Sequence, residues 1–142
     1  MFDYDDEGLS KEIKQKIKDN SAQCNFLKNR IRETFLKREH SPKKRDLWHQ
    51  ACEEFHANKK KLYFPDGEDQ LHSCKPEKWD FYVVEKVLCF LEVRPYHDRS
   101  GYIRKYLLRH IKKAYLTDKQ KVRLEVVYQR EKAWQNKRML KA

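Results

Sequence analysis

The chain has 142 residues, a formal net charge of +11 at pH 7, and equal shares of charged and hydrophobic residues, 39% each. This length suits a single domain, residues 1–142, with a sizeable core, and the apolar residues gather in periodic segments, which argues against disorder. The longest apolar run, 81–91, is interrupted by two charges and is too short for a membrane-spanning helix. The acidic N-terminus lacks the pattern of a secretory signal, so we expect a cytoplasmic protein.

Glycine and cysteine usage narrows the fold class further. Three glycines in the whole chain make glycine-rich phosphate loops and tight β-turns scarce, which favours helices. Three of the four cysteines, Cys24, Cys52 and Cys89, lie in apolar surroundings typical of buried thiols. Only Cys74, in a polar stretch, has the surroundings of a reactive thiol.

The first predicted helix follows an acidic tail, residues 1–9. Ser10 is its expected cap, and apolar residues recur with a 4, 3, 4, 3 rhythm from Ile13 to Phe35, which predicts one long helix to about Arg38. The alternative is a break near residues 20–21, where Ser21 would cap a second helix.

The second predicted helix begins at Ser41-Pro42, because a serine cap followed by proline is a common helix start. Its apolar residues continue at helical spacing to Phe55, and we expect it to end near residues 59–61. Two turn signals, Pro65-Asp66-Gly67 and Pro76, then predict one long loop, 62–78. Residues 62–64 are expected to anchor this loop on the core, with a very short strand as the alternative.

The central element is predicted at about residues 77–93, where the sequence is apolar on nearly all sides. Lys78, Glu85 and Glu92 form a narrow polar stripe at seven-residue spacing, and a helix of this kind is buried by its neighbours. A buried strand would suit the residue types but not the length. Pro95 is expected to end the helix.

Two further helices are predicted in the C-terminal third. One begins at about residues 98–101, with apolar residues on one side and cations on the other. The other begins at Thr117, which with Gln120 fits a capping box, and runs through Trp134. Together these elements predict an all-α fold of four to five helices in an irregular antiparallel bundle or short helical array.

The positive charge is segregated. Residues 1–93 hold 18 basic and 18 acidic side chains, whereas residues 94–142 hold 15 basic and 4 acidic ones, which accounts for the entire net charge. Such a bias attracts polyanions without a specific motif. The candidate nucleic-acid-binding residues are Arg99, Arg104, Lys105, Arg109, Lys112, Lys113, Lys119, Lys121 and Arg123.

The turn 94–102 carries the densest set of chemically capable side chains. A possible anion site comprises Arg94, His97, Arg99, Ser100 and Gly101, since free N–H groups at a helix start favour negative charge. In a catalytic version, His97 would be a general base for phosphoester hydrolysis. In the structural alternative, Asp98 or Ser100 caps the helix, Arg94 pairs with Glu92 or a neighbour, and Tyr96 and Tyr102 pack on the core.

A metal site is a weaker alternative. His49, Cys52, Glu53 and His56 share a helical face, but no second E-x-x-H pair accompanies them, and a buried thiol with two surface histidines explains the set. We predict no metal, no cofactor and no catalytic residue.

The sequence therefore predicts a non-enzymatic binding module whose basic C-terminal helical face engages a polyanion. Nucleic acid is the favoured partner. RNA binding or non-specific binding is favoured over sequence-specific DNA recognition, because the turn between the last two helices lacks the glycine usual in helix-turn-helix proteins. The alternative is an adaptor, inhibitor or immunity-type protein that binds an acidic protein surface.

Overall fold

The structure, a computed structural model, describes residues 3–141, and the described part is helical without strands. Six α-helices follow in the order α1 Asp3–Lys37, α2 Pro42–Tyr63, α3 Asp69–His72, α4 Phe81–Val93, α5 Ser100–His110 and α6 Asp118–Lys141. Two short 3₁₀ helices, η1 Pro76–Lys78 and η2 Ile111–Lys113, precede α4 and follow α5. The predicted all-α class is confirmed.

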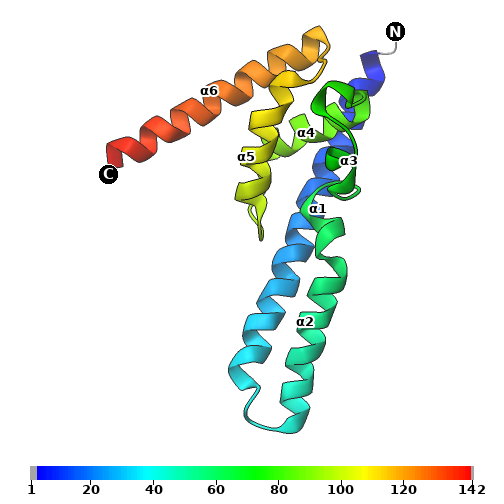
Figure 1. Cartoon of the computed structure of the whole chain (residues 1–142). Coiled ribbons are helices and arrows are strands. Elements are labelled where there is room, and N and C mark those ends of the chain that lie inside the picture. Colours follow the sequence, from blue (N-terminus) through cyan, green and yellow to red (C-terminus); the bar gives the residue numbers. More distant parts are fainter. Residues whose placement is uncertain (1–2, 142) are drawn as a thin grey trace.

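α1 and α2 form a long antiparallel hairpin whose tip extends away from the other helices (Figure 1). α1 already begins at Asp3, so residues 3–9, expected as a tail, are helical, and Met1 and Phe2 lie outside the described residues. The alternative break at residues 20–21 is wrong. Ser21 does not cap a helix, because it is buried within α1 and its hydroxyl donates to the carbonyl of Tyr96 at 3.2 Å.

α2 starts as predicted, with Pro42 in its first turn and the Ser41 hydroxyl accepting from the Lys44 N–H at 3.2 Å. It continues to Tyr63, beyond the expected end, because Tyr63 and Phe64 are both buried in the core. The alternative short strand at 62–64 does not form. The expected loop 62–78 also contains α3 and η1, which raises the helix number above the prediction.

α4 is the buried central helix that the sequence predicts, and it packs against α1, α5 and α6. Val84, Val87, Leu88 and Cys89 on it are fully buried. The helix begins at Phe81 rather than at residue 77, because the Asp80 side chain caps it by accepting from the Val83 N–H at 2.9 Å.

α5 and α6 pack against α4, and these three helices are here called the head of the molecule. Gln120 and Thr117 form the predicted capping box, with the Gln120 N–H donating to Thr117 Oγ1 at 3.2 Å and the Thr117 N–H donating to Gln120 Oε1 at 2.9 Å. The first half of α6 lies over α4, and its C-terminal half projects away from the head (Figure 1). None of the described helices has the length and apolar character that crossing a membrane requires.

Candidate functional site

The basic side of α5 is exposed along its length. Ile103 and Leu107 point into the core, and their burial orients the opposite side of the helix toward solvent. Four of the predicted residues lie on that opposite side and on η2, and all four are exposed: Lys105, Arg109, Lys112 and Lys113. Within the described chain none of the four pairs with a carboxylate, so their charge is directed to solvent.

Two aromatic side chains flank these cations. Tyr102 lies one turn before Lys105 on the same side of α5 and is 72% exposed, and Tyr115 follows η2 and is 81% exposed. Large aromatic rings with this exposure lack a packing role. We call Tyr102, Lys105, Arg109, Lys112, Lys113 and Tyr115 the α5 strip.

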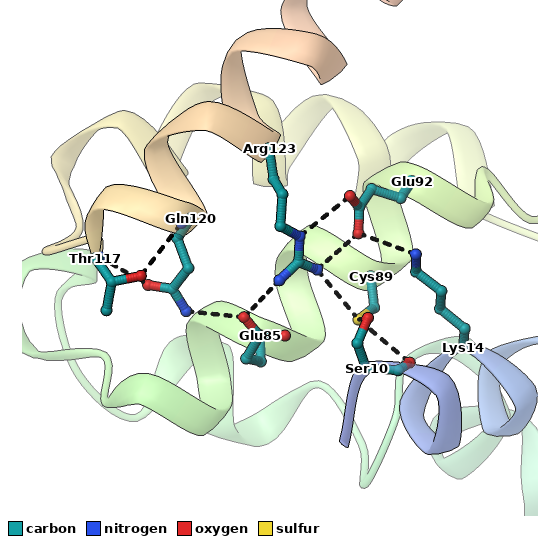
Figure 2. Close-up of polar contacts among 8 residues, drawn as sticks. All are labelled: Ser10, Lys14, Glu85, Cys89, Glu92, Thr117, Gln120 and Arg123. Atoms are coloured by element: carbon teal, nitrogen blue, oxygen red, sulfur yellow. Dashed lines mark hydrogen bonds and ion pairs between the residues drawn. The ribbon is translucent and has the colours of Figure 1, made fainter. Parts of the chain in front are cut away.

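Arg123, another of the predicted binding residues, has a different environment, which the sequence did not indicate (Figure 2). It lies over the polar stripe of α4, donating from Nη1 to Glu85 Oε1 at 2.6 Å and from Nη2 to Glu92 Oε1 at 2.7 Å. Lys14 from α1 adds a second cation 3.4 Å from Glu92, and the Gln120 amide donates to Glu85 at 3.1 Å. Arg123 is therefore an internal cation that joins α6 to α4, and it does not belong to the exposed candidate binding residues.

The electrostatics of this cluster agree with an internal role. Burial opposes the charge of Arg123, but the hydrogen bonds that Arg123 donates to Glu92 and Glu85, together with their negative charges, outweigh it and raise the pKa of Arg123. Burial likewise opposes ionisation of Glu92, and hydrogen bonding and charge from Arg123 together lower its pKa. Both groups are thus held charged across the physiological range.

The remaining predicted cations differ in their surroundings. Arg104 Nε lies 3.8 Å from Glu131 on α6, so it faces a carboxylate and not open solvent. Arg99 is exposed, and its guanidinium lies 5.8 Å from the Tyr102 ring centroid. Lys119 and Lys121 are exposed in the first turn of α6.

The five residues of the predicted anion site do not converge. Arg94 turns toward α6, where it pairs with Glu131 and lies 4.5 Å from the Trp134 ring centroid. His97 is buried, stacked on Tyr63 and in edge contact with Phe90, and the Ser100 hydroxyl accepts from the His97 N–H at 3.1 Å. The Arg99 guanidinium lies 5.8 Å from the exposed Tyr102 ring centroid, and Gly101 lies in the first turn of α5.

This turn instead anchors α5 to the hairpin. The Tyr96 carbonyl accepts from Ser21 and from the Asn25 amide, and the Tyr63 hydroxyl donates to Asp98. Neither Asp98 nor Ser100 caps α5, whose first flanking residue, Arg99, has a left-handed φ of 66°. The rest of the structural alternative is also wrong in detail. Arg94 pairs with Glu131 on α6 and not with Glu92 or a sequence neighbour, and Tyr96 and Tyr102 are exposed instead of packed on the core.

The helical face with His49 and Cys52 forms no ligand set. Among the described residues no three His, Cys, Asp or Glu side chains converge as ligands of a metal would. His49 contacts the Trp48 ring and His56 contacts Phe55.

A cleft that the sequence did not indicate lies beside the α5 strip. It has a volume of about 190 Å³ between α3 and α5. Its lining residues are Glu68, Leu71, His72, Arg99, Tyr102, Ile103 and Tyr106. Residues 68–72 were expected in a structureless loop. The only features of the sequence that relate to this cleft are two pairs at helical i, i+4 spacing, Glu68 with His72 and Tyr102 with Tyr106. Nothing in the sequence indicates that the two pairs lie close together.

Comparison with known proteins adds no assignment to this geometry. No protein-family model, no curated protein and no solved structure matches the chain.

Proposed function

We propose that this protein is a non-enzymatic nucleic-acid-binding module that uses the α5 strip. The observation that carries the proposal is the run of four exposed cations, Lys105 to Lys113, that no carboxylate of the described chain neutralises, flanked by two exposed tyrosine rings. Cations of this kind bind phosphates and release the counterions condensed on a nucleic acid.

The dimensions of the strip fit a short length of strand. Eight residues separate Lys105 from Lys113, which corresponds to about 12 Å along the helix axis at ~1.5 Å per residue. Each strand of a duplex carries one phosphate per ~3.4 Å of helix axis, so a strip of this length that lies along the axis spans three or four phosphates.

The exposed rings favour a single strand. Tyr102 and Tyr115 present faces on which unpaired bases can stack, and such stacking tolerates different sequences. Bases inside a duplex are already stacked on one another and do not offer this contact. RNA or single-stranded DNA is therefore the favoured partner.

Two other features fit the proposal. All four cysteines are free thiols, as is usual for the reducing cytoplasm that the sequence predicts. His97, the one candidate general base, is buried against two aromatic rings instead of facing a substrate pocket, so we keep the proposal non-enzymatic.

An acidic protein partner is the second candidate, and one observation favours it. The outer side of α6 exposes apolar residues among its cations, including Val122, Val126 and Leu140. Apolar contacts surrounded by charge are typical of a protein interface.

Fluorescence anisotropy with a labelled single-stranded RNA tests the proposal. With four phosphates neutralised, the logarithm of the association constant should fall against that of salt concentration with a slope of about −3, since each contact on a single strand contributes ~0.7. The triple variant Lys105→Glu, Arg109→Glu and Lys112→Glu should lose binding by at least about 100-fold at low salt. Absence of RNA or single-stranded DNA binding at about 50 mM salt would refute the proposal.

A matched control separates this face from the overall charge. The variant Lys37→Glu, Lys43→Glu and Lys44→Glu changes the net charge equally, but at exposed positions of the hairpin tip, far from α5 (Figure 1). It should retain most of the affinity. An equal loss in both triple variants would show that net charge, and not the α5 strip, binds the nucleic acid.

A further inference from the structure

Four arginines gather where α5 and the end of α4 meet the second half of α6. Arg94 Nη1 donates to Glu131 Oε1, and Arg104 Nε lies 3.8 Å from the same oxygen. The other two, Arg130 and Arg138, lie on α6 itself. Arg130 adjoins Glu131 in the chain, and Arg138 follows Glu131 by about two helical turns, which places it on the same side of α6. We call these four arginines the arginine cluster.

The arginine cluster carries more positive charge than its surroundings neutralise. Among residues 3–141, Glu131 is the one carboxylate within ion-pair distance of these arginines, because Arg130 donates to a backbone carbonyl, that of Glu92, at 3.1 Å. Burial lowers the pKa of Arg94, and the charges of the other three arginines lower it further, against the opposing charge of Glu131. Four positive charges against one negative charge leave an excess of three.

The arginine cluster is accessible from solvent. The side chains of Arg94 and Arg104 are 21% and 22% exposed, and Arg130 and Arg138 are exposed. The C-terminal half of α6 projects away from the head (Figure 1), and every residue from 132 to 140 is exposed. An anion from solvent can therefore reach these guanidinium groups.

An aromatic ring accompanies the arginines. Trp134 follows Glu131 by three residues, so it lies on the same side of α6, and the Arg94 guanidinium is 4.5 Å from its ring centroid. The Trp134 side chain is nevertheless 49% exposed, which leaves ring surface on which a nucleobase can stack. Guanidinium groups bind phosphate through paired N–H donors. The arginine cluster and Trp134 thus offer both kinds of contact that a single strand makes.

We propose that the arginine cluster and Trp134 form a second contact surface for the nucleic-acid strand that binds the α5 strip. This inference rests on the proposed function. Arg104 directly precedes Lys105 of the strip, and its contact with Glu131 places it on the flank of α5 that faces α6. A strand can therefore continue from the α5 strip onto α6, with phosphates at the arginines and a base on Trp134. The excess positive charge of both surfaces complements the phosphates of such a strand.

Glu131→Gln tests this proposal with an unusual sign, because it removes the negative charge of the arginine cluster. The affinity for a uridine RNA nonamer should rise about threefold at low salt, the size expected of one partly exposed charge pair. The free energy of unfolding should fall in the same variant, since Arg94 loses its counter-charge. A purely structural ion pair predicts the loss of stability without the gain in affinity.

Glu125→Gln is the matched control for Glu131→Gln. Glu125 is exposed on the same helix and accepts from the Gln129 amide at 2.9 Å, so the variant makes the same change in net charge outside the arginine cluster. It should raise the affinity less than Glu131→Gln does. In the same way, Arg138→Gln should weaken binding more than Lys137→Gln, which removes a neighbouring exposed cation.

Tryptophan fluorescence reports on the stacking contact. RNA should quench the emission of the wild-type protein, and Trp134→Phe should remove most of this quenching. Trp79 is 4% exposed and Trp48 lies on the α1–α2 hairpin, so neither should respond to a strand bound between α5 and α6.

The outcomes separate the two proposals. RNA binding without quenching, quenching that survives Trp134→Phe, or equal affinities of Glu131→Gln and Glu125→Gln would overturn the second contact surface and leave the α5 strip intact. If the RNA does not bind at all, both the proposed function and the second contact surface are overturned.

Discussion

Arg123 and Arg109 belong to the same basic segment, and the structure gives them opposite environments. Arg123 is held between two carboxylates of α4 with its side chain 24% exposed, while Arg109 is exposed and meets no carboxylate in the described chain. The first stabilises the fold and the second is available to a partner. A count of cations therefore overstates a binding surface, because the interior of this protein also uses them.

The difference follows from where each helix crosses α4. Glu85 and Glu92 are seven residues apart, so both carboxylates lie on one side of α4, and α6 is the helix that covers that side. A cation at position 123 meets both acids. α5 turns its apolar side inward with Ile103 and Leu107, which leaves its cations outside.

The largest expected effect comes from removing the internal cation. Arg123→Met leaves Glu85 buried without its counter-charge and should lower the free energy of unfolding by about 3 kcal/mol, as is typical when one partner of a buried pair is lost. Urea denaturation measures the change.

Arg109→Met is the control for Arg123→Met, because it makes the same substitution at an exposed arginine. Its side chain is exposed, so the free energy of unfolding should change by less than about 0.5 kcal/mol, while the RNA affinity falls. The distinction between the two arginines would fail if Arg123→Met were as stable as Arg109→Met.

A smaller effect concerns acid. Burial lowers the pKa of His97, and the nearby Asp98 and Glu68 only partly oppose this shift. The unfolded chain then binds a proton that the folded chain does not, so stability should be full above about pH 6.5 and decline as the pH falls toward the lowered pKa, by at most ~1.4 kcal/mol per pH unit. Tyr63, stacked on His97, stays neutral in this range, because burial and its bond to Asp98 raise its pKa.

His97→Gln checks this prediction. The difference in unfolding free energy between about pH 7.5 and pH 5.5 should be smaller in the variant than in the wild type, whatever its absolute stability. An unchanged difference would assign the acid sensitivity to other groups.

The smallest expected effect is a change in the pKa of His110 when RNA binds to the α5 strip. Burial lowers the pKa of His110, and the charges of Lys113 and Arg109 lower it further. A polyanion bound to the strip would neutralise these two charges, so RNA should raise the pKa of His110. NMR titration of the His110 ring with and without RNA measures the shift. A pKa that RNA does not change would place the bound strand away from Lys113 and Arg109.

Local patterns explain why much of the fold was predictable. Ser41-Pro42, the Thr117–Gln120 box and Pro95 act through neighbouring backbone groups, and each begins or ends a helix as expected. The apolar run at 81–91 had to be buried wherever the other helices lay. Expectations failed where packing between distant segments decided the outcome, as at Tyr63 and Phe64, whose burial in the core accompanies the extension of α2 beyond its expected end.

The candidate site, like the fold, has some features that the sequence predicts and others that depend on tertiary packing. Sequence alone determined the five longer helices, the buried centre and the excess of cations after residue 93, because these depend on periodicity and composition. Only the tertiary structure decided that Arg123 is internal, that the α5 strip is exposed, and that Glu68 and His72 meet Tyr102 and Tyr106 in a cleft. Those outcomes depend on which helix covers which face, and the relative placement of helices is set by long-range packing that no short stretch of sequence encodes.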